Sequence, residues 1–214
     1  MNLQKLLEQK RKTDQENLPP QYLKVLKTSI RDLVRSGIQN KLIKPGSKLP
    51  DFELKNHNGQ IIKSSYLYSQ GPLIITFYRG FWCPYCNFDL ANLNHYLPRI
   101  KEAGAHSIAI SPEKAVYSKK IIMMQKLKFD ILWDQENKIA DELGLKFNLS
   151  QDMIDLYRDK LHVNLKMYHG DNDWSLPIPA RFLVDTNGIV KYAESSPDYT
   201  KRPELDDIMA ILES

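Results

Sequence analysis

The feature that most constrains the fold is a continuous apolar run, 72-PLIITFY-78, which leads directly into the only two cysteines of the chain. A run of this length and composition is typical of a strand buried on both faces of a sheet. Strand patterns at 107–111 and 129–134 follow, and they alternate with helix patterns at 84–102 and 113–127. This alternation predicts an α/β domain built on parallel strands.

Turn signals at both ends of this region predict hairpins. Asn58-Gly59 separates two short strand patterns, and Asn187-Gly188 separates another two. Between the central region and the second hairpin, segment 146–178 interrupts the rhythm, and we expect a helix at 150–161 followed by a polar loop. An amphipathic helix is expected at 203–213. The predicted fold is a central mixed sheet, flanked by helices, that contains strands 72–78, 107–111, 129–134, 180–185 and 189–194.

The amino-terminal segment has a different character from the rest of the chain. Residues 3–16 and 21–38 read as two helices separated by Pro19-Pro20, and 44-KPG-46 then breaks the chain. We therefore divide the chain into a helical extension, 1–44, and an α/β domain, 45–214. An apolar stripe in the second helix must pack on the domain or on a second copy, so a homodimer is one possible outcome. Its members are Leu23, Leu26, Ile30 and Leu33.

Composition and charge exclude several classes of protein. With 42% hydrophobic and 26% charged residues, the chain is neither disordered nor membrane-embedded. The first residues contain no signal-peptide core, so we expect a cytoplasmic protein. The net charge is +4, and residues 1–40 alone hold eight Lys/Arg and four Asp/Glu. These charges are interspersed as on a solvated helix face, so we predict binding to neither nucleic acid nor membrane.

Cys83 and Cys86 lie at the predicted junction between strand 72–78 and helix 84–102. Pro84 suits the first turn of a helix, where its missing N–H costs nothing. Cys83 would then face the positive end of the helix dipole, which lowers the pKa of a thiol. Since Cys86 lies three residues later, the two sulfurs can form a disulfide. We expect Cys83 at the helix start with its sulfur partly exposed.

Two purely structural roles for the cysteine pair are less consistent with the sequence. The cysteines could be small apolar core residues, or half of a zinc site. There is no second cysteine pair, however, and the five histidines form no ligand-spaced pair. We therefore predict no metal and no cofactor, and redox chemistry at the pair.

The stretch WCPYC resembles the active site of thioredoxin-fold proteins, and its CPYC core is similar to that of glutaredoxins. Five further stretches are PGSKLPDFELKNHNG, the strand ending in FY, SIAISPEK, FDILWDQENKIADELGL and LPIPARFLVDTNGIVKYAESSPDYTKRPE. Through them the chain, from about Pro45 to the end, resembles the peroxiredoxin-like AhpC/TSA family. This resemblance implies a thioredoxin-like fold and thiol-dependent reduction of hydroperoxides.

The resemblance departs from the family pattern at the site itself. Peroxiredoxins carry P-x-x-x-T-x-x-C, in which the cysteine attacks peroxide. In this register Cys86 takes the attacking position, Cys83 replaces the threonine, and Arg79 replaces the proline. The family's catalytic arginine would fall on Pro179, and Arg181 lies nearby but out of register. The peroxidase residues are therefore incomplete by that pattern, and Arg79 becomes a candidate for an electrostatic role.

The missing residues are replaced by thioredoxin-like ones. Pro179 resembles the cis-proline that faces the cysteines in thioredoxin folds, so we predict a cis Ile178–Pro179 bond. The backbone of Ile178 would then be free to pair with an extended substrate. The expected substrate-binding residues are Trp82, Pro84, Tyr85, Ile178 and Pro179.

Three functions remain open at this point. The scaffold favours reduction of hydroperoxides through the Cys83/Cys86 pair. The CPYC motif and Pro179 favour a thiol-disulfide oxidoreductase that acts on protein or small-molecule disulfides. A redox-sensing binding module is the third. The reductant would be of the thioredoxin, glutaredoxin or glutathione type, and the sequence leaves open which cysteine attacks.

Overall fold

A computed structural model describes residues 2–214. Its centre is a seven-stranded sheet in the order β2-β1-β5-β4-β3-β8-β9. β3, β4 and β5 run parallel, while β1, β2, β8 and β9 pair antiparallel with their neighbours. The strands are β1 (Glu53–Asn56), β2 (Ile61–Lys63), β3 (Leu73–Phe77), β4 (His106–Ser111), β5 (Asp130–Trp133), β8 (Ala180–Val184) and β9 (Val190–Ser195). The predicted mixed sheet, with both hairpins, is confirmed.

Helices cover both faces of the sheet, because the buried strands are apolar on both sides. Ile74 of β3 points into one core, while Leu73 and Ile75 point into the other. The first core lies beneath α1 (Leu3–Asn17), α4 (Pro84–Glu102), α5 (Ala115–Gln125) and α9 (Leu205–Leu212). The second lies beneath α3 (Ser64–Ser69), α6 (Lys138–Glu142) and the short 3₁₀ helix Ile38–Lys41.

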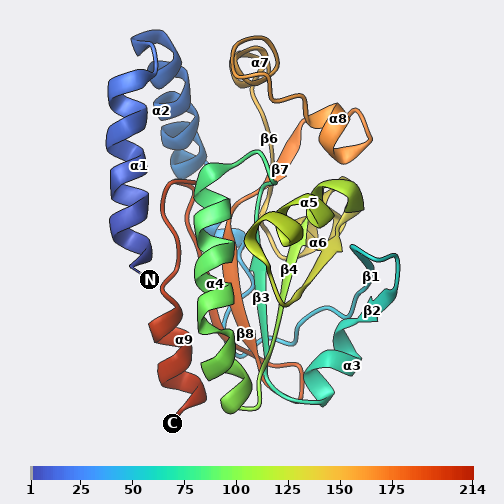
Figure 1. Cartoon of the computed structure of the whole chain (residues 1–214). Coiled ribbons are helices and arrows are strands. Elements are labelled where there is room, and N and C mark those ends of the chain that lie inside the picture. The colour runs from blue at the N-terminus through green and yellow to red at the C-terminus, as the bar shows by residue number, and fades with distance from the viewer. Residues whose placement is uncertain (1) are drawn as a thin grey trace.

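The amino-terminal helices pack on the α/β domain. Figure 1 shows α1 running alongside α4, and Leu3 and Leu7 of α1 are buried in the core that contains both cysteines. In α2 (Pro20–Arg35), Leu26 is buried against Leu149 and Met153. The apolar stripe of the second helix is therefore buried at least in part by the chain itself. None of the helices in residues 2–214 has the length and apolar character needed to cross a bilayer.

Segment 146–178 differs from the prediction. The expected helix at 150–161 begins as α7 (Gln151–Asp155) and widens into a π-helix, Leu156–Lys160. The expected polar loop instead contains α8 (Leu165–His169) and a strand, β7 (Ser175–Pro177), which pairs with β6 (Lys146–Asn148). Elements of three to five residues are too short for periodicity to reveal them. The segment matters for function because it carries Tyr157 to the cysteines.

Candidate active site

The cysteine pair lies where β3 delivers the chain to α4. Cys83 is the N-cap residue of α4, Pro84 occupies its first position, and Cys86 lies in its first turn. The Cys86 thiol donates a hydrogen bond to the sulfur of Cys83, with 2.9 Å between the two Sγ atoms. This separation is within about 1 Å of a disulfide bond length.

Both cysteines are 0% exposed, so the predicted partial exposure of Cys83 is wrong. Their cover combines the neighbouring Trp82 with side chains from distant parts of the sequence, Tyr157 and Tyr199, and with α1. The three rings, which we call the aromatic cover, pack edge to face or over the Arg79 side chain. The local sequence predicts that Cys83 lies at the start of a helix, but tertiary packing decides whether its sulfur is exposed.

Arg79 is the cation closest to Cys83. Its Nη2 lies 3.3 Å from Cys83 Sγ, and its Nη1 donates to the Tyr157 hydroxyl at 2.9 Å. The guanidinium centre lies 3.9 Å from the ring centroid of Tyr199 and 4.9 Å from that of Trp82. The side chain is buried, and within residues 2–214 it forms no ion pair with a carboxylate. A buried cation needs an anion, and the nearest candidate is the Cys83 thiolate.

The surroundings shift the pKa values of the two thiols in opposite directions. Burial alone would raise the pKa of Cys83, but the hydrogen bond from Cys86 and the positive charges of Arg79 and Arg202 outweigh it. The pKa of Cys83 therefore lies well below its ordinary value. For Cys86, burial, the hydrogen bond to Cys83 and the charge on Cys83 raise the pKa well above that value. These opposite shifts favour ionisation of Cys83 before Cys86.

A second buried charge cluster lies beneath Cys86. Arg202 Nη2 donates to Cys86 Sγ at 3.1 Å, and its Nε lies 3.4 Å from an oxygen of Asp89. Arg181 donates to the other Asp89 oxygen at 2.6 Å. Arg181 therefore binds Asp89, while Arg202 is the arginine that touches Cys86. The Asp89 carboxylate therefore pairs with two guanidinium groups and partly neutralises the charge of Arg202. Arg79, by contrast, has no carboxylate partner within residues 2–214.

Glu113 is a buried acid beside the loop that carries Arg79 and Trp82. One of its oxygens accepts from the Phe81 N–H at 2.6 Å, and the other has no hydrogen-bond partner. Burial raises the pKa of Glu113 to about 8, the Phe81 N–H lowers it, and the nearby Cys83 raises it. Glu113 is therefore mostly neutral at pH 7, and it does not act as a counter-ion for the arginines.

The predicted cis bond before Pro179 is wrong, because no peptide bond in residues 2–214 is cis. The backbone is also not free for a substrate, since Ile178 N–H already donates to the carbonyl of Leu145 at 2.9 Å. Ile178 and Pro179 are both buried, and they line a narrow pocket that also contains Arg79. Ile178 and Pro179 therefore line a pocket, and the Ile178 N–H is not available to pair with an extended substrate.

The other predicted substrate-binding residues occupy different environments. Trp82 belongs to the aromatic cover, whereas Pro84 is exposed on the outer surface of the helix start. Tyr85 is buried, and its hydroxyl donates to Asp14 of α1 at 2.7 Å. Tyr85 therefore anchors the amino-terminal helix next to the cysteines.

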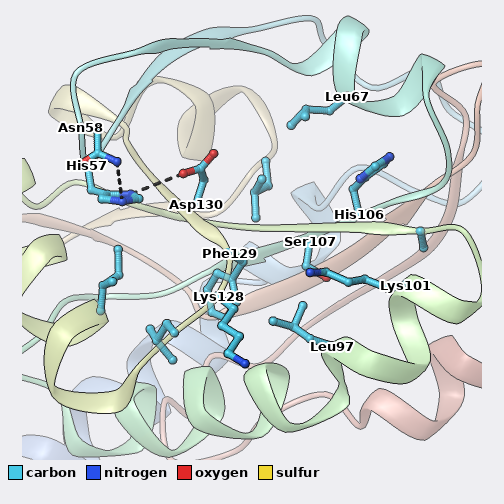
Figure 2. Close-up of a pocket in the computed structure, with 14 residues that line it drawn as sticks. His57, Asn58, Leu67, Leu97, Lys101, His106, Ser107, Lys128, Phe129 and Asp130 are labelled. Atoms are coloured by element: carbon cyan, nitrogen blue, oxygen red, sulfur yellow. Dashed lines mark hydrogen bonds and ion pairs between the residues drawn. The ribbon is translucent and has the colours of Figure 1, made fainter.

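A separate pocket of about 440 Å³ lies at the amino ends of β4 and β5 (Figure 2). His57 contacts Asn58 and Asp130 on its rim, and Lys101 and Lys128 lie close by. Cys83 follows the carboxyl end of β3, and β3, β4 and β5 run parallel. The pocket and the cysteines therefore lie at opposite ends of these strands. The pocket has no access to the cysteines. No group of three or more potential metal ligands (His, Cys, Asp, Glu) occurs in the part of the chain that the structure describes.

Sequence reasoning missed several residues that surround the sulfurs. Asp89 lies three residues after Cys86, a spacing that places both on one helix face and could have been noticed. Tyr157, Tyr199 and Arg202 carry no local signal, because they reach the site only through the tertiary fold. Tyr199, Arg202 and Glu113 do lie in stretches that carry the family resemblance.

A thioredoxin-like sheet with two hydrogen-bonded thiols at the start of a helix, one of them acidified, defines a cysteine-based oxidoreductase. The family model for the AhpC/TSA family matches residues 45–193, and the chain belongs to this family. Its members are peroxiredoxin-type enzymes, so the chain falls in the thiol peroxidase class.

The relatives and the structural neighbours agree with this assignment. Chloroplastic peroxiredoxin Q of Oryza sativa subsp. japonica is 24% identical over 172 residues, which cover 80% of this chain and 68% of the relative. The crystal structure of peroxidoxin BcpB from Mycobacterium tuberculosis matches with a TM-score of 0.63 at 22% identity, over 80% of this chain and 97% of that one. Peroxiredoxin Q of Xanthomonas campestris matches with a TM-score of 0.58 at 17% identity, over 80% and 95%. At these identities the solved structures support the fold.

Proposed function

We propose that the chain reduces small hydroperoxides, with Cys83 as the attacking thiolate and Cys86 as the resolving thiol. The Cys83 thiolate attacks the terminal peroxide oxygen, the O–O bond breaks, and Cys83 becomes a sulfenic acid. The departing alkoxide or hydroxide takes up a proton. The Cys86 sulfur then attacks the sulfenic sulfur, which releases water and leaves a Cys83–Cys86 disulfide.

The observation that carries this assignment is the pairing of Arg79 with Cys83. Arg79 has no carboxylate partner within residues 2–214, and its Nη2 lies 3.3 Å from Cys83 Sγ. Arg202, which contacts Cys86, shares its charge with Asp89. The less compensated cation therefore faces Cys83, at the end of α4 where the helix dipole also favours a negative charge. Both effects stabilise a thiolate on Cys83 over one on Cys86.

Burial of the sulfurs favours a peroxide over a disulfide as the oxidising substrate. A disulfide must bring its sulfur into line with Cys83, which is 0% exposed. A peroxide of a few atoms can reach a buried thiolate through a far smaller opening. We therefore infer that peroxide reacts with the site in the form seen in the structure, in which both cysteines are buried; we call this the closed form.

Regeneration needs a reductant, for which the family suggests a thioredoxin-type partner; glutaredoxin and glutathione remain candidates. Any of these thiols must attack one sulfur of the buried disulfide. This attack requires the aromatic cover or α1 to move. If α1 moves, the hydrogen bond from Tyr85 to Asp14 is one contact that has to break. The order of events is then peroxide reduction in the closed form, opening, and reduction of the disulfide.

Single-turnover consumption of hydrogen peroxide by the reduced wild type, Cys83→Ser and Cys86→Ser tests the proposal. We expect Cys83→Ser to lose the reaction, and Cys86→Ser to consume one equivalent of peroxide while its Cys83 stays a sulfenic acid, because no thiol remains to form the disulfide. Loss of the first turnover in Cys86→Ser, with retention in Cys83→Ser, would instead assign the attack to Cys86.

Thiol-disulfide exchange is the second candidate, because the acidified Cys83 and the CPYC spacing also suit that reaction. The same three proteins are assayed with a peptide disulfide. We expect slow reaction of the wild type, limited by opening of the site. Wild-type turnover that is faster with the disulfide than with hydrogen peroxide would favour this second function.

A further inference from the structure

A narrow pocket leads from α2 to Arg79. Its cavity volume is about 10 Å³, which is room for about one water molecule. Its lining includes Ile30 and Leu33 of α2, Phe147 and Met153, and at the site itself Tyr157 and Arg79. Among these lining side chains, Arg79 is the one that donates to the Cys83 sulfur, at 3.3 Å.

The narrow pocket adjoins a wide groove, with which it shares three lining residues. This groove has a volume of about 650 Å³ and lies between α2 and residues 147–152. Ser29, Leu33 and Phe147 line both the groove and the narrow pocket, so they form the boundary between the two. These three side chains therefore stand between the groove and the pocket that Arg79 lines.

The chemistry along this path suits a small polar oxidant. Apart from Ser29, the walls around the narrow pocket are aliphatic or aromatic until Arg79 is reached, where the Tyr157 hydroxyl lies beside it. A peroxide that crosses the apolar throat would meet hydrogen-bond donors on a cation that already contacts Cys83. Wider molecules would have to displace Leu33 or Phe147, and both side chains are only partly buried.

We propose that α2 of the amino-terminal extension forms a wall of the peroxide entry path, and that Leu33 and Phe147 act as a size filter. This inference rests on the proposed peroxidase function, and it assigns the substrate class as hydrogen peroxide and hydroperoxides of similar width. The extension then determines specificity, although the match to the AhpC/TSA family begins only at residue 45. A hydrophobic throat discriminates by about 10-fold or more for each carbon-sized difference.

The test compares hydrogen peroxide with cumene hydroperoxide, a bulky aromatic hydroperoxide, in single-turnover reactions of the full chain. Wild type is expected to prefer hydrogen peroxide. Leu33→Ala and Phe147→Ala should raise the cumene-to-hydrogen peroxide rate ratio by about 10-fold or more. The matched control is Leu23→Ala on the same helix, since Leu23 lines neither the narrow pocket nor the groove. It should leave the ratio unchanged.

A filling variant keeps the test decisive if a truncated variant does not fold. Ser29→Trp should slow the reaction with hydrogen peroxide while leaving the thiolate absorbance of Cys83 unchanged. The inference is overturned if wild type reduces both peroxides equally well. It is also overturned if folded Leu33→Ala and Phe147→Ala keep the wild-type ratio, or if Ser29→Trp reacts at the wild-type rate. Failure of the proposed function looks different, because wild type would then consume neither peroxide.

Discussion

Glu113 should make the stability of the fold depend on pH, and Glu113→Gln should remove that dependence. The side chain is 0% exposed, and burial raises its pKa from the ordinary 4.5 to about 8. Glutamine keeps the size of the side chain and an oxygen that can accept from the Phe81 N–H. It cannot ionise, so the substitution isolates the proton.

The sign and size follow from the two pKa values. The folded state keeps its proton up to about pH 8, whereas the unfolded state loses it above about pH 4.5. The favourable contribution is therefore complete below pH 4.5 and declines as the pH rises towards 8. Linkage gives a loss of about 2.5 kcal/mol in the free energy of unfolding between pH 5 and pH 7.

The assay is urea unfolding of the reduced protein at pH 5, 6 and 7, followed by tryptophan fluorescence. Cys83 has the opposite effect on stability. Because its pKa is lower in the folded state, its contribution to the free energy of unfolding grows as the pH rises towards the pKa of the unfolded thiol. The informative quantity is therefore the difference in the free energy of unfolding between wild type and variant. Between pH 5 and pH 7, Glu113→Gln should lose about 2.5 kcal/mol less than wild type. Glu102→Gln, at an exposed glutamate, is the control and should follow wild type. Parallel curves for wild type and Glu113→Gln would refute the reasoning.

Three further changes test the charges and contacts around the sulfurs. Arg79→Gln should raise the pKa of Cys83 by about 1–3 pH units, as measured by thiolate absorbance, because it removes the nearest cation; an unchanged titration would contradict this. Asp89→Asn should destabilise the fold by about 3–5 kcal/mol in urea unfolding, since two buried guanidinium groups lose their shared anion; a loss below about 1 kcal/mol would argue against that ion pair. Tyr85→Phe should speed reduction of the disulfide by dithiothreitol about fivefold, because it loses a bond of about 1 kcal/mol to α1. It should leave the peroxide step unchanged; equal reduction rates in variant and wild type would show that this bond does not hold the site closed.

The sequence predicted the elements whose signals are long or local. The apolar run 72–78, the Asn-Gly turns and the helix that follows Pro84 all carry such signals, and the structure has the corresponding strands, hairpins and helix. Short elements such as β6 and α8 do not, because three to five residues cannot establish a period.

The surroundings of the cysteines could be predicted only in part. Position along the helix depends on neighbouring residues, so the place of Cys83 at the N-cap followed from Pro84. Its burial depends on Tyr157 and Tyr199, which lie more than 70 residues away along the chain. Whether Pro179 is cis, and which arginine meets which sulfur, likewise depends on packing that no local pattern encodes.

The identity of the attacking sulfur tests the central claim most directly. Reduced Cys86→Ser is treated with one equivalent of hydrogen peroxide in the presence of a sulfenic-acid trap, and the modified peptide is mapped by mass spectrometry. The account predicts a stoichiometric adduct on Cys83, formed as fast as wild type consumes peroxide, and no adduct on Cys86 in a parallel reaction of Cys83→Ser. An adduct on Cys86 of Cys83→Ser at the wild-type rate, with Cys83 of Cys86→Ser left unmodified, would contradict it.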